Sequence, residues 1–541
     1  MYPTFDKIRE MAAAGDYKRI PICKELYADS YTPVEMMRIL QKASHHCYLL
    51  ESASQNEVWG RYSFLGYDPS MEITCTDGIL RIRRTDELFE NKTDALNTEK
   101  AEPKKTDALV NGKTRTNEAD SLHDKKAENN VRTEKKQSEE VMQVTHPGDA
   151  IRKIIQQYKS PVMDNMPTFT GGLVGYFSYD YIKYSEPKLD LTDAEQQDFR
   201  DLDLMLFNEV IAFDHYRQKV LLITGVMTDN LDESYKRACE KLEEMTRLIQ
   251  KGEKKEFPPI CLKSEIQPQF PKEKYCEMVE KAKHYIHEGD IFQVVLSNPM
   301  RAKATGSLFD TYRVLRATNP SPYMFYFSSD DIEIAGASPE TLAKLEHGKL
   351  STFPLAGTRP RGKTPQEDKA LEADLLQDEK ELAEHNMLVD LGRNDIGKIS
   401  RLGSVKVEKY LTVERYSCVM HLGSTVTGTI ADGRDAIDAV DAILPAGTLS
   451  GAPKFRACQI IQELEQSKRG IYGGAIGYVD FTGNLDVCIA IRLVYKKKDE
   501  ICIRSGAGIV ADSVPEKEFE ECQNKARAVV RAISQAEEGL E

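Results

Sequence analysis

The stretch GGAIGYVDFTGNLDVCIAIRLVYKKKDEICIRSGAGIV (473–510) decides the fold class. It contains three apolar segments with glycine, aromatic and β-branched residues: 473–481, 485–497 and 500–510. Such segments are typical of strands, and the TGN between the first two is a short turn, so we expect a hairpin over 473–497. Hairpins join antiparallel strands, and the stretch therefore argues against a doubly wound parallel sheet.

The same mixture of elements continues outward from this stretch. Helical patterns occupy 33–50, 231–252 and 273–287, and apolar strand patterns occupy 201–215, 219–227, 290–300 and 323–328. Strands and helices are interspersed, and hairpins are common. We therefore expect an α+β fold with mainly antiparallel sheets.

Length, charge and cysteine content limit the class of protein. The chain has 541 residues, and its formal net charge of −14 argues against nucleic-acid binding, which needs a basic surface. Its 11 cysteines have no CxxC spacing, which fits a reducing compartment. No apolar run approaches the roughly 20 residues of a membrane span, and the start lacks a signal-peptide layout. We expect a soluble, cytoplasmic protein.

Composition also suggests how the chain is divided. From Asn91 to Glu140 there is no aromatic residue, and charged residues dominate, so we expect a disordered insertion at 86–142. A polar, proline-bearing connector at 263–273 marks a region boundary. We therefore expect an N-terminal region at 1–262 and a C-terminal region at 263–541.

Two helical segments each carry a pair of glutamates one turn apart. In DEKELAEHNMLVDLGRND (378–395), Asp378 suits the N-cap position, and Glu381 and Glu384 share one face. In SVPEKEFEECQNKARAVVRAI (513–533), Ser513 and Glu516 fit a capping box with Pro515 in the first turn, and the pair is Glu518 and Glu521.

Two interpretations of these glutamates remain open at this point. Both faces could be solvated, with a Glu521–Lys525 pair at i,i+4 spacing. Alternatively, the pairs meet across a cavity, where four carboxylates need a hard cation such as Mg²⁺ between them.

Three glycine-containing segments could hold an anion. They are PLAGTRPRG (354–362), LPAGTLSGAPK (444–454) and RSGAGIV (504–510); we expect the first two to be loops, and the third is the glycine-rich end of the strand pattern at 500–510. None fits a known phosphate loop: the second lacks the GK[ST] ending, and no helix starts directly after the third.

Taken together, these motifs resemble the chorismate-utilising enzymes, and among them most closely the component I (large subunit) family of anthranilate synthases. The resemblance rests on PLAGTRPRG, ELAEHNMLVDLGRND, HLGSTVTG, LPAGTLSGAPK, GGAIGYVD and SGAGIVADSVPEKEFEECQNKARA, in this order, and on LLES (49–52). It covers nearly all of 273–535. It implies a two-lobed fold in which antiparallel sheets pack together and helices lie outside. It also implies that the C-terminal region binds chorismate. The implied activity is that of a lyase that makes anthranilate, in the first step of tryptophan biosynthesis.

The resemblance also assigns residues. The chorismate ligands it implies are Gly357, Thr358, Tyr472, Arg492, Gly506, Ala507, Gly508 and Lys525. The metal would be Mg²⁺, held by Glu384 and Glu521 with Glu381 and Glu518 nearby. Glu340 would be the general acid, and His421 would lie close to the reacting ring. Feedback inhibition by tryptophan would involve Ser52, Pro322, Tyr323 and Met324.

Two positions discriminate among activities within the family. Relatives that add water carry a lysine where this chain has Gln293, and a neutral amide cannot activate water as a base. Aminodeoxychorismate synthases carry a nucleophilic lysine where this chain has Ala356. Direct attack by ammonia is then the remaining route.

No GxCxG-type glutaminase motif is present in the chain, so the resemblance implies a separate glutamine amidotransferase subunit (component II) that supplies ammonia. Two alternatives remain: an aminodeoxychorismate synthase component I, and a tryptophan-binding regulatory scaffold without catalysis.

Overall fold

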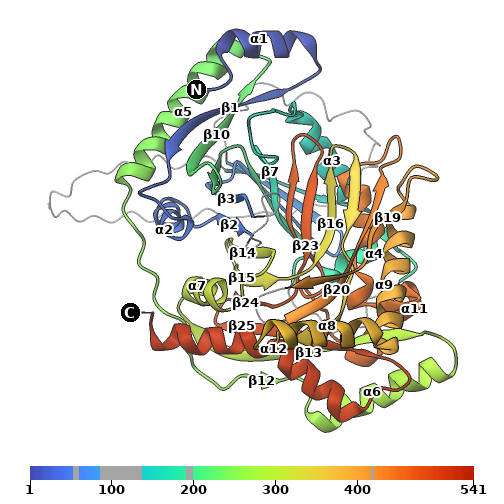
Figure 1. Cartoon of the computed structure of the whole chain (residues 1–541). Helices are drawn as coiled ribbons and strands as arrows, with labels where there is room; N and C mark the ends of the chain where they lie inside the picture. Colours follow the sequence, from blue (N-terminus) through green and yellow to red (C-terminus); the bar gives the residue numbers. More distant parts are fainter. Residues whose placement is uncertain (53–59, 86–136, 190–198, 416–418, 541) are drawn as a thin grey trace, which may run out of the picture.

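The computed structural model describes residues 1–52, 60–85, 137–189, 199–415 and 419–540. Two large sheets form its centre, and helices lie on their outer faces (Figure 1). Every strand pairing in these ranges is antiparallel, as expected for an α+β fold.

The first sheet has 13 strands. In spatial order they are β1 (Arg19–Tyr27), β10 (Lys219–Met227), β9 (Val210–Asp214), β3 (Tyr62–Tyr67), β2 (Cys47–Glu51), β14 (Tyr323–Ser328), β15 (Ile332–Ser338), β24 (Leu493–Lys497), β25 (Glu500–Ile509), β13 (Gln293–Thr305) and β11 (Cys261–Leu262), with β12 (Gln267–Pro268) and β21 (Gly451–Ala452) also on β13.

The second sheet has 12 strands. In spatial order they are β18 (Leu355–Pro360), β20 (Val419–Thr429), β17 (Lys349–Thr352), β16 (Thr341–Glu346), β23 (Leu485–Ile489), β22 (Ala475–Asp480), β7 (Gly172–Phe177), β8 (Leu202–Phe207), β4 (Met71–Thr76), β5 (Ile79–Thr85) and β6 (Gln137–Gln143), with β19 (Lys406–Arg415) also on β20. Both sheets combine strands from before and after residue 262, and the division of the chain at that residue stays a prediction.

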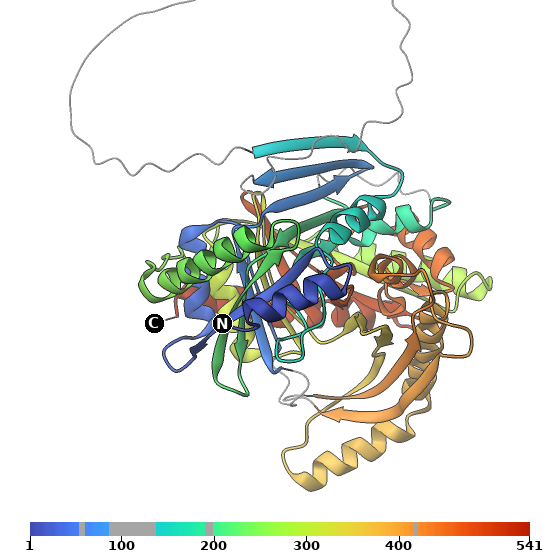
Figure 2. The same cartoon turned by 90° about the horizontal axis from the view of Figure 1, so that it is seen from above.

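The helices and helical turns of the described chain are α1 (Phe5–Ala14), α2 (Pro33–Ala43), α3 (Gly148–Gln157), η1 (Tyr179–Tyr181), α4 (Ile182–Ser185), α5 (Leu231–Lys251), α6 (Lys272–His287), α7 (Phe309–Thr318), α8 (Pro365–Gln377), α9 (Glu379–Gly397), α10 (Ala436–Ile443), η2 (Gly447–Leu449), α11 (Lys454–Glu465) and α12 (Pro515–Glu538). Figure 2 shows α8, coloured gold, at the outer edge of the molecule beside the orange strands β19 and β20. None of the described helices combines the length and the apolar character that crossing a membrane requires.

Three apolar cores hold the layers together. One lies between the sheets, and each of the other two lies between a sheet and its covering helices. Strand β14 contributes side chains to two of these cores. Phe325 and Phe327 belong to the core between the sheets, whereas Met324 and Tyr326 belong to the core under α7 and α12. Because side chains alternate across a strand, both faces of this strand are buried.

Three expectations about elements are corrected by the structure. The helical pattern at 33–50 ends as α2 at Ala43, because β2 begins at Cys47. The proposed insertion at 86–142 is too long at its end: residues 137–142 belong to β6, which pairs with β5, while 86–136 lie outside the described residues. The expected hairpin exists as β22–β23, but 485–497 is not a single strand.

The chain changes sheets within 485–497. Strand β23 lies in the second sheet and β24 in the first, and Arg492 between them has a left-handed backbone with φ of 55°. The segment 201–215 divides in the same way into β8 and β9 on either side of Asn208. These segments are apolar throughout because both sheets bury both faces, so hydrophobicity alone does not reveal the break.

Candidate active site

Two neighbouring chain crossings between the sheets form the centre of the site. One crossing, between β15 and β16, carries Glu340, and the other, between β23 and β24, carries Arg492. Backbone N–H groups of Ala337 and Ile489 donate to the carbonyls of Arg492 and Glu340, at 3.1 and 2.9 Å. These bonds hold the two charged residues at adjacent positions.

The carboxyl group of Glu340 lies in a desolvating environment. Thr448, in η2, donates a hydrogen bond from Oγ1 to Glu340 Oε1 at 3.1 Å, and both residues line a small cavity of about 40 Å³. Burial raises the pKa of Glu340 to about 7, against the lowering effects of the Thr448 bond and the Lys525 charge. The group can therefore be protonated near neutral pH, as a general acid requires.

Two cations lie beside the β25 strand. Lys525 of α12 donates from Nζ to the carbonyl of Gly506 at 3.1 Å, and Arg492 donates from Nη1 to the carbonyl of Lys525 at 2.6 Å. Burial lowers the pKa of Arg492, and the neighbouring Tyr472 and Glu521 oppose this. The structure thus brings together Arg492 and Lys525, the two cations among the residues that the resemblance assigns to chorismate.

His421 of β20 faces the glycine of β18. Its Nδ1 lies 2.9 Å from the carbonyl oxygen of Gly357 and 3.1 Å from Thr358 Oγ1. Burial lowers the pKa of His421, which favours the neutral imidazole. Because a carbonyl only accepts, the proton belongs on Nδ1, and Nε2 carries the lone pair.

Two of the three glycine segments are strands: the expectation of a loop at 354–362 is wrong, whereas the strand pattern predicted at 500–510 is confirmed. Residues 355–360 form β18, where a bulge at Gly357 has φ of 66°, and residues 504–509 belong to β25, which pairs with β13. The glycines serve close packing: a Cβ on Gly506 would lie 3.0 Å from Tyr472 Oη, and one on Gly508 would lie 2.6 Å from Gln293 Nε2. Ala507 between them is fully buried.

The four glutamates lie on α9 and α12. Asp378 caps α9 as expected, accepting from the N–H groups of Lys380 and Glu381. The capping box at Ser513 is wrong: the N-cap residue of α12 is Val514, and the Ser513 hydroxyl accepts from Val510 N–H.

Their charges interact across the two helices. Burial, Glu381 and Glu521 together raise the pKa of Glu384, and burial and Glu521 raise that of Glu518. Lys525 Nζ forms an ion pair with Glu521 Oε1 at 2.7 Å, so the simple i,i+4 pair is also present. The negative charge of Glu521 thus acts on Glu384 of the other helix, and carboxylate oxygens are ligands that a hard cation such as Mg²⁺ prefers.

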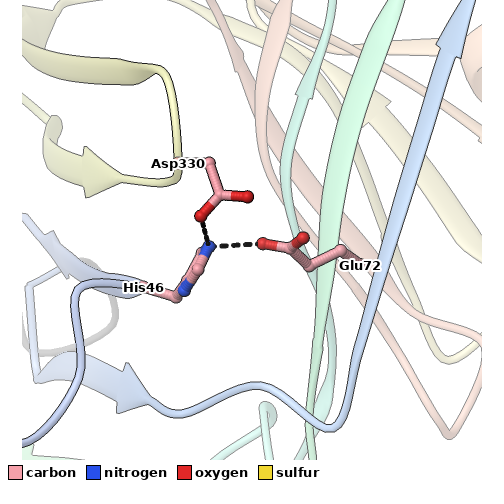
Figure 3. Close-up of side chains that lie close together, drawn as sticks. All are labelled: His46, Glu72 and Asp330. Carbon is pink, nitrogen blue, oxygen red and sulfur yellow. Dashed lines mark ion pairs between the residues drawn. The ribbon is translucent and has the colours of Figure 1, made fainter. Parts of the chain in front are cut away.

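A different group brings metal-ligating atoms closer together in the described part of the chain. His46 Nε2 lies 2.5 Å from Glu72 Oε1 and 3.0 Å from Asp330 Oδ1 (Figure 3). Arg83 Nη1 contacts the same two carboxylates at 3.0 and 2.6 Å. Two cationic side chains balance the two carboxylates, so we interpret the group as an ion cluster that joins the sheets.

The residues expected at the inhibitor site lie on neighbouring strands. Ser52 follows β2, and Met324 of β14 pairs with Glu51 at the end of β2. Tyr323 reaches the second sheet, where its hydroxyl contacts Thr341 and Asp486, and Pro322 precedes it at the start of the strand.

Sequence reasoning missed Thr448 as a partner of Glu340. The residue stands inside the quoted segment LPAGTLSGAPK, but no spacing rule links it to a carboxylate 108 positions earlier. Only the folded arrangement of η2 against the β15–β16 crossing shows the contact.

Comparison with known proteins agrees with this arrangement. Residues 95–531 match the family model described as chorismate binding enzyme. The chain is 41% identical to "Anthranilate synthase component 1" of Acetivibrio thermocellus over 545 residues, covering 99% of each chain. The crystal structure of anthranilate synthase component I from Streptococcus pneumoniae TIGR4 has 34% identity and a TM-score of 0.67, covering 88% of this chain and 94% of that one.

A more distant structure shares the fold alone. The menaquinone-specific isochorismate synthase MenF from Escherichia coli has 16% identity and a TM-score of 0.64, and the match covers 98% of both chains. The family match extends over most of the chain, and the relative from Acetivibrio thermocellus is matched over 99% of its length. The chain belongs to the chorismate binding enzyme family.

Proposed function

We propose that this protein is the large subunit of an anthranilate synthase, a Mg²⁺-dependent lyase. It converts chorismate and ammonia into anthranilate, pyruvate and water, the first step of tryptophan biosynthesis. The observation that carries the proposal is Glu340: a carboxyl group whose pKa is raised to about 7 stands within the electrostatic range of Lys525 and beside the crossing that carries Arg492.

The chain's own residues supply binding and proton transfer. Arg492 and Lys525 offer positive charge to the carboxylates of chorismate. Ammonia attacks ring carbon 2, and protonated Glu340 gives its proton to the hydroxyl at carbon 4, which leaves as water. In the second half, neutral His421 has the lone pair at Nε2 that could accept the ring proton as the enolpyruvyl group leaves as pyruvate.

The metal site belongs to the same proposal. Glu384 and Glu521, with Glu381 and Glu518 nearby, would hold Mg²⁺, which would draw electron density from the ring through the ring carboxylate. The raised pKa values of Glu384 and Glu518 support this donor set, because a cation between the carboxylates relieves their repulsion.

The remaining proposals concern partners and control. A glutamine amidotransferase subunit would supply ammonia, and tryptophan would inhibit by binding at Ser52, Pro322, Tyr323 and Met324. The reaction is cytoplasmic in this proposal.

Two alternatives are weaker. An aminodeoxychorismate synthase needs a nucleophile where this chain has Ala356, a buried residue of β18 without one. A tryptophan-binding scaffold without catalysis has no need for the Glu340–Thr448 pair or the cations beside it.

One assay separates these possibilities. The purified protein is mixed with chorismate, ammonium and Mg²⁺, and anthranilate is followed by its fluorescence, with Glu340→Gln as the inactive control. We expect anthranilate with ammonium and none with glutamine alone. Absence of anthranilate with ammonium contradicts the proposed activity, and activity with glutamine alone contradicts the need for a second subunit.

A further inference from the structure

A buried ion cluster lies behind the candidate chorismate site. Glu465, at the end of α11, forms ion pairs with Arg469 at 2.5 Å and with Arg504 of β25 at 2.7 Å. All three side chains are at most 3% exposed. Within the described residues, Glu465 is the only carboxylate paired with either arginine, so the cluster carries one net positive charge.

Arg469 also donates hydrogen bonds to backbone carbonyl groups of two different segments that border the site. Its Nη1 donates to the carbonyl of Leu449 at 2.6 Å, and its Nη2 donates to the carbonyl of Val295 at 2.7 Å. Leu449 follows Thr448, which holds Glu340, and Val295 of β13 is the register partner of Gly508. One guanidinium therefore fixes the loop of the general acid to β13, the strand that pairs with the glycines of β25.

The same guanidinium also lies close to two aromatic rings. Its central carbon lies 5.8 Å from the ring centroid of Tyr472 and 4.6 Å from that of Tyr179. Tyr472 in turn stands against Gly506, where a Cβ would meet its hydroxyl oxygen at 3.0 Å. A planar fork with five donors can reach all these groups at once, and an ammonium group cannot.

Ser297 links Arg504 to Glu465 by hydrogen bonds. Arg504 Nε donates to Ser297 Oγ at 2.8 Å, and Ser297 donates to Glu465 Oε1 from its N–H at 2.7 Å and from its hydroxyl at 2.9 Å. Glu465 is thus fully engaged, and its role is to fix the two arginines rather than to meet a ligand.

We propose that Arg469 is a positioning residue for the chorismate site, which aligns the η2 loop, the β13–β25 strands and Tyr472 and places a net positive charge behind a site for a dianionic substrate. This inference rests on the proposed function. It implies that the guanidinium geometry, and not only the charge, determines catalysis.

The test compares Arg469→Lys with Arg200→Lys. Arg200 is half-buried and pairs with buried Asp203 at 2.7 Å and with Asp331 at 3.2 Å, neither of which is a site residue, so it controls for the loss of an arginine–aspartate pair. We expect Arg469→Lys to lower kcat/KM for chorismate by about 10- to 100-fold, the range of a lost charge-assisted contact. We also expect the alkaline limb of its pH profile to move to higher pH, because the Thr448 bond that lowers the pKa of Glu340 is loosened. Arg200→Lys should lose stability while kcat/KM stays within about twofold.

The outcomes are distinct. A folded Arg469→Lys with unchanged kcat, KM and pH limb overturns the inference. If Arg469→Lys does not fold, Ser297→Ala is measured instead: a smaller loss in kcat/KM with the same movement of the limb supports the inference, and unchanged kinetics overturns it. A wild-type protein that makes no anthranilate is a separate result, which rejects the proposed function and this inference with it.

Discussion

Tyr323 and Thr341 form a hydrogen bond between the two sheets, with 2.9 Å between their hydroxyl oxygens. Tyr323 lies on β14 of the first sheet and Thr341 begins β16 of the second. The Tyr323 hydroxyl also donates to Asp486 Oδ1 of β23 at 2.8 Å. Since Thr341 directly follows Glu340, this contact links a residue expected at the inhibitor site with the neighbour of the proposed general acid.

The link predicts that Tyr323→Phe weakens inhibition by tryptophan more than it weakens catalysis. Allosteric coupling energies are typically about 1–3 kcal/mol, so the concentration for half inhibition should rise by about 5- to 150-fold. Tyr326→Phe is the matched control, because its hydroxyl contacts Glu333 on the other face of the same strand. Calorimetric titration with tryptophan separates weaker binding from lost coupling. Unchanged inhibition in Tyr323→Phe would show that this contact carries no signal.

Glu340 predicts a defined pH dependence. Its acid form is needed, and with a pKa of about 7 that form declines as pH rises through neutrality, so the rate per free ammonia should fall on the alkaline side. Glu340→Gln should lower the rate by about 10²- to 10⁴-fold. Glu333→Gln, on β15, is the control and should leave the rate unchanged.

Thr448→Val tests whether the pKa of Glu340 sets the fall in rate at alkaline pH, which is the alkaline limb of the pH profile. The Thr448 hydroxyl lowers the pKa of Glu340, so its removal should move the alkaline limb to higher pH. Initial rates measured across neutrality, corrected for free ammonia, report the shift. A limb that moves to lower pH in this variant would mean that another group sets it.

Local elements of this fold were predictable where their signals are local. Asp378 caps α9 and Pro515 begins α12, because capping groups act within one turn. The hairpin β22–β23 follows from its short turn. The candidate site residues came from the family resemblance, and the structure brings Glu340, Arg492 and Lys525 together.

The crossings between sheets were not predictable. A strand buried on both faces has no alternation of polar and apolar residues, so 201–215 and 485–497 each resemble one long strand. The chain nevertheless changes sheets at Asn208 and at Arg492. The crossing at Arg492 is also where the site forms, and contacts such as Thr448 with Glu340 depend on it.

Glu521→Ala tests the proposed metal site. We expect turnover to be abolished, and tryptophan binding to be retained because β2 and β14 are not touched. Glu520→Ala, an exposed neighbour on the same helix, is the control. Glu521 also pairs with Lys525, so a lost ion pair could lower the rate as well. The rate is therefore measured at several Mg²⁺ concentrations, because loss of a metal ligand changes the Mg²⁺ dependence. Normal turnover with normal Mg²⁺ dependence would remove Glu521 from the site.

The His46 cluster predicts a stability change in alkaline solution. Burial disfavours the charged imidazole, but Asp330 and Glu72 outweigh it and raise the pKa of His46 to about 9, above the roughly 6.5 of an unfolded chain. The stabilisation is therefore complete below about pH 6.5 and is lost as pH rises through about 9. The free energy of unfolding of wild type should exceed that of His46→Gln at pH 6, and the difference should shrink towards pH 9. Arg83 is present in both proteins and keeps its charge throughout this range, so a difference that stays constant with pH would show that the charge of His46 does not provide the stabilisation.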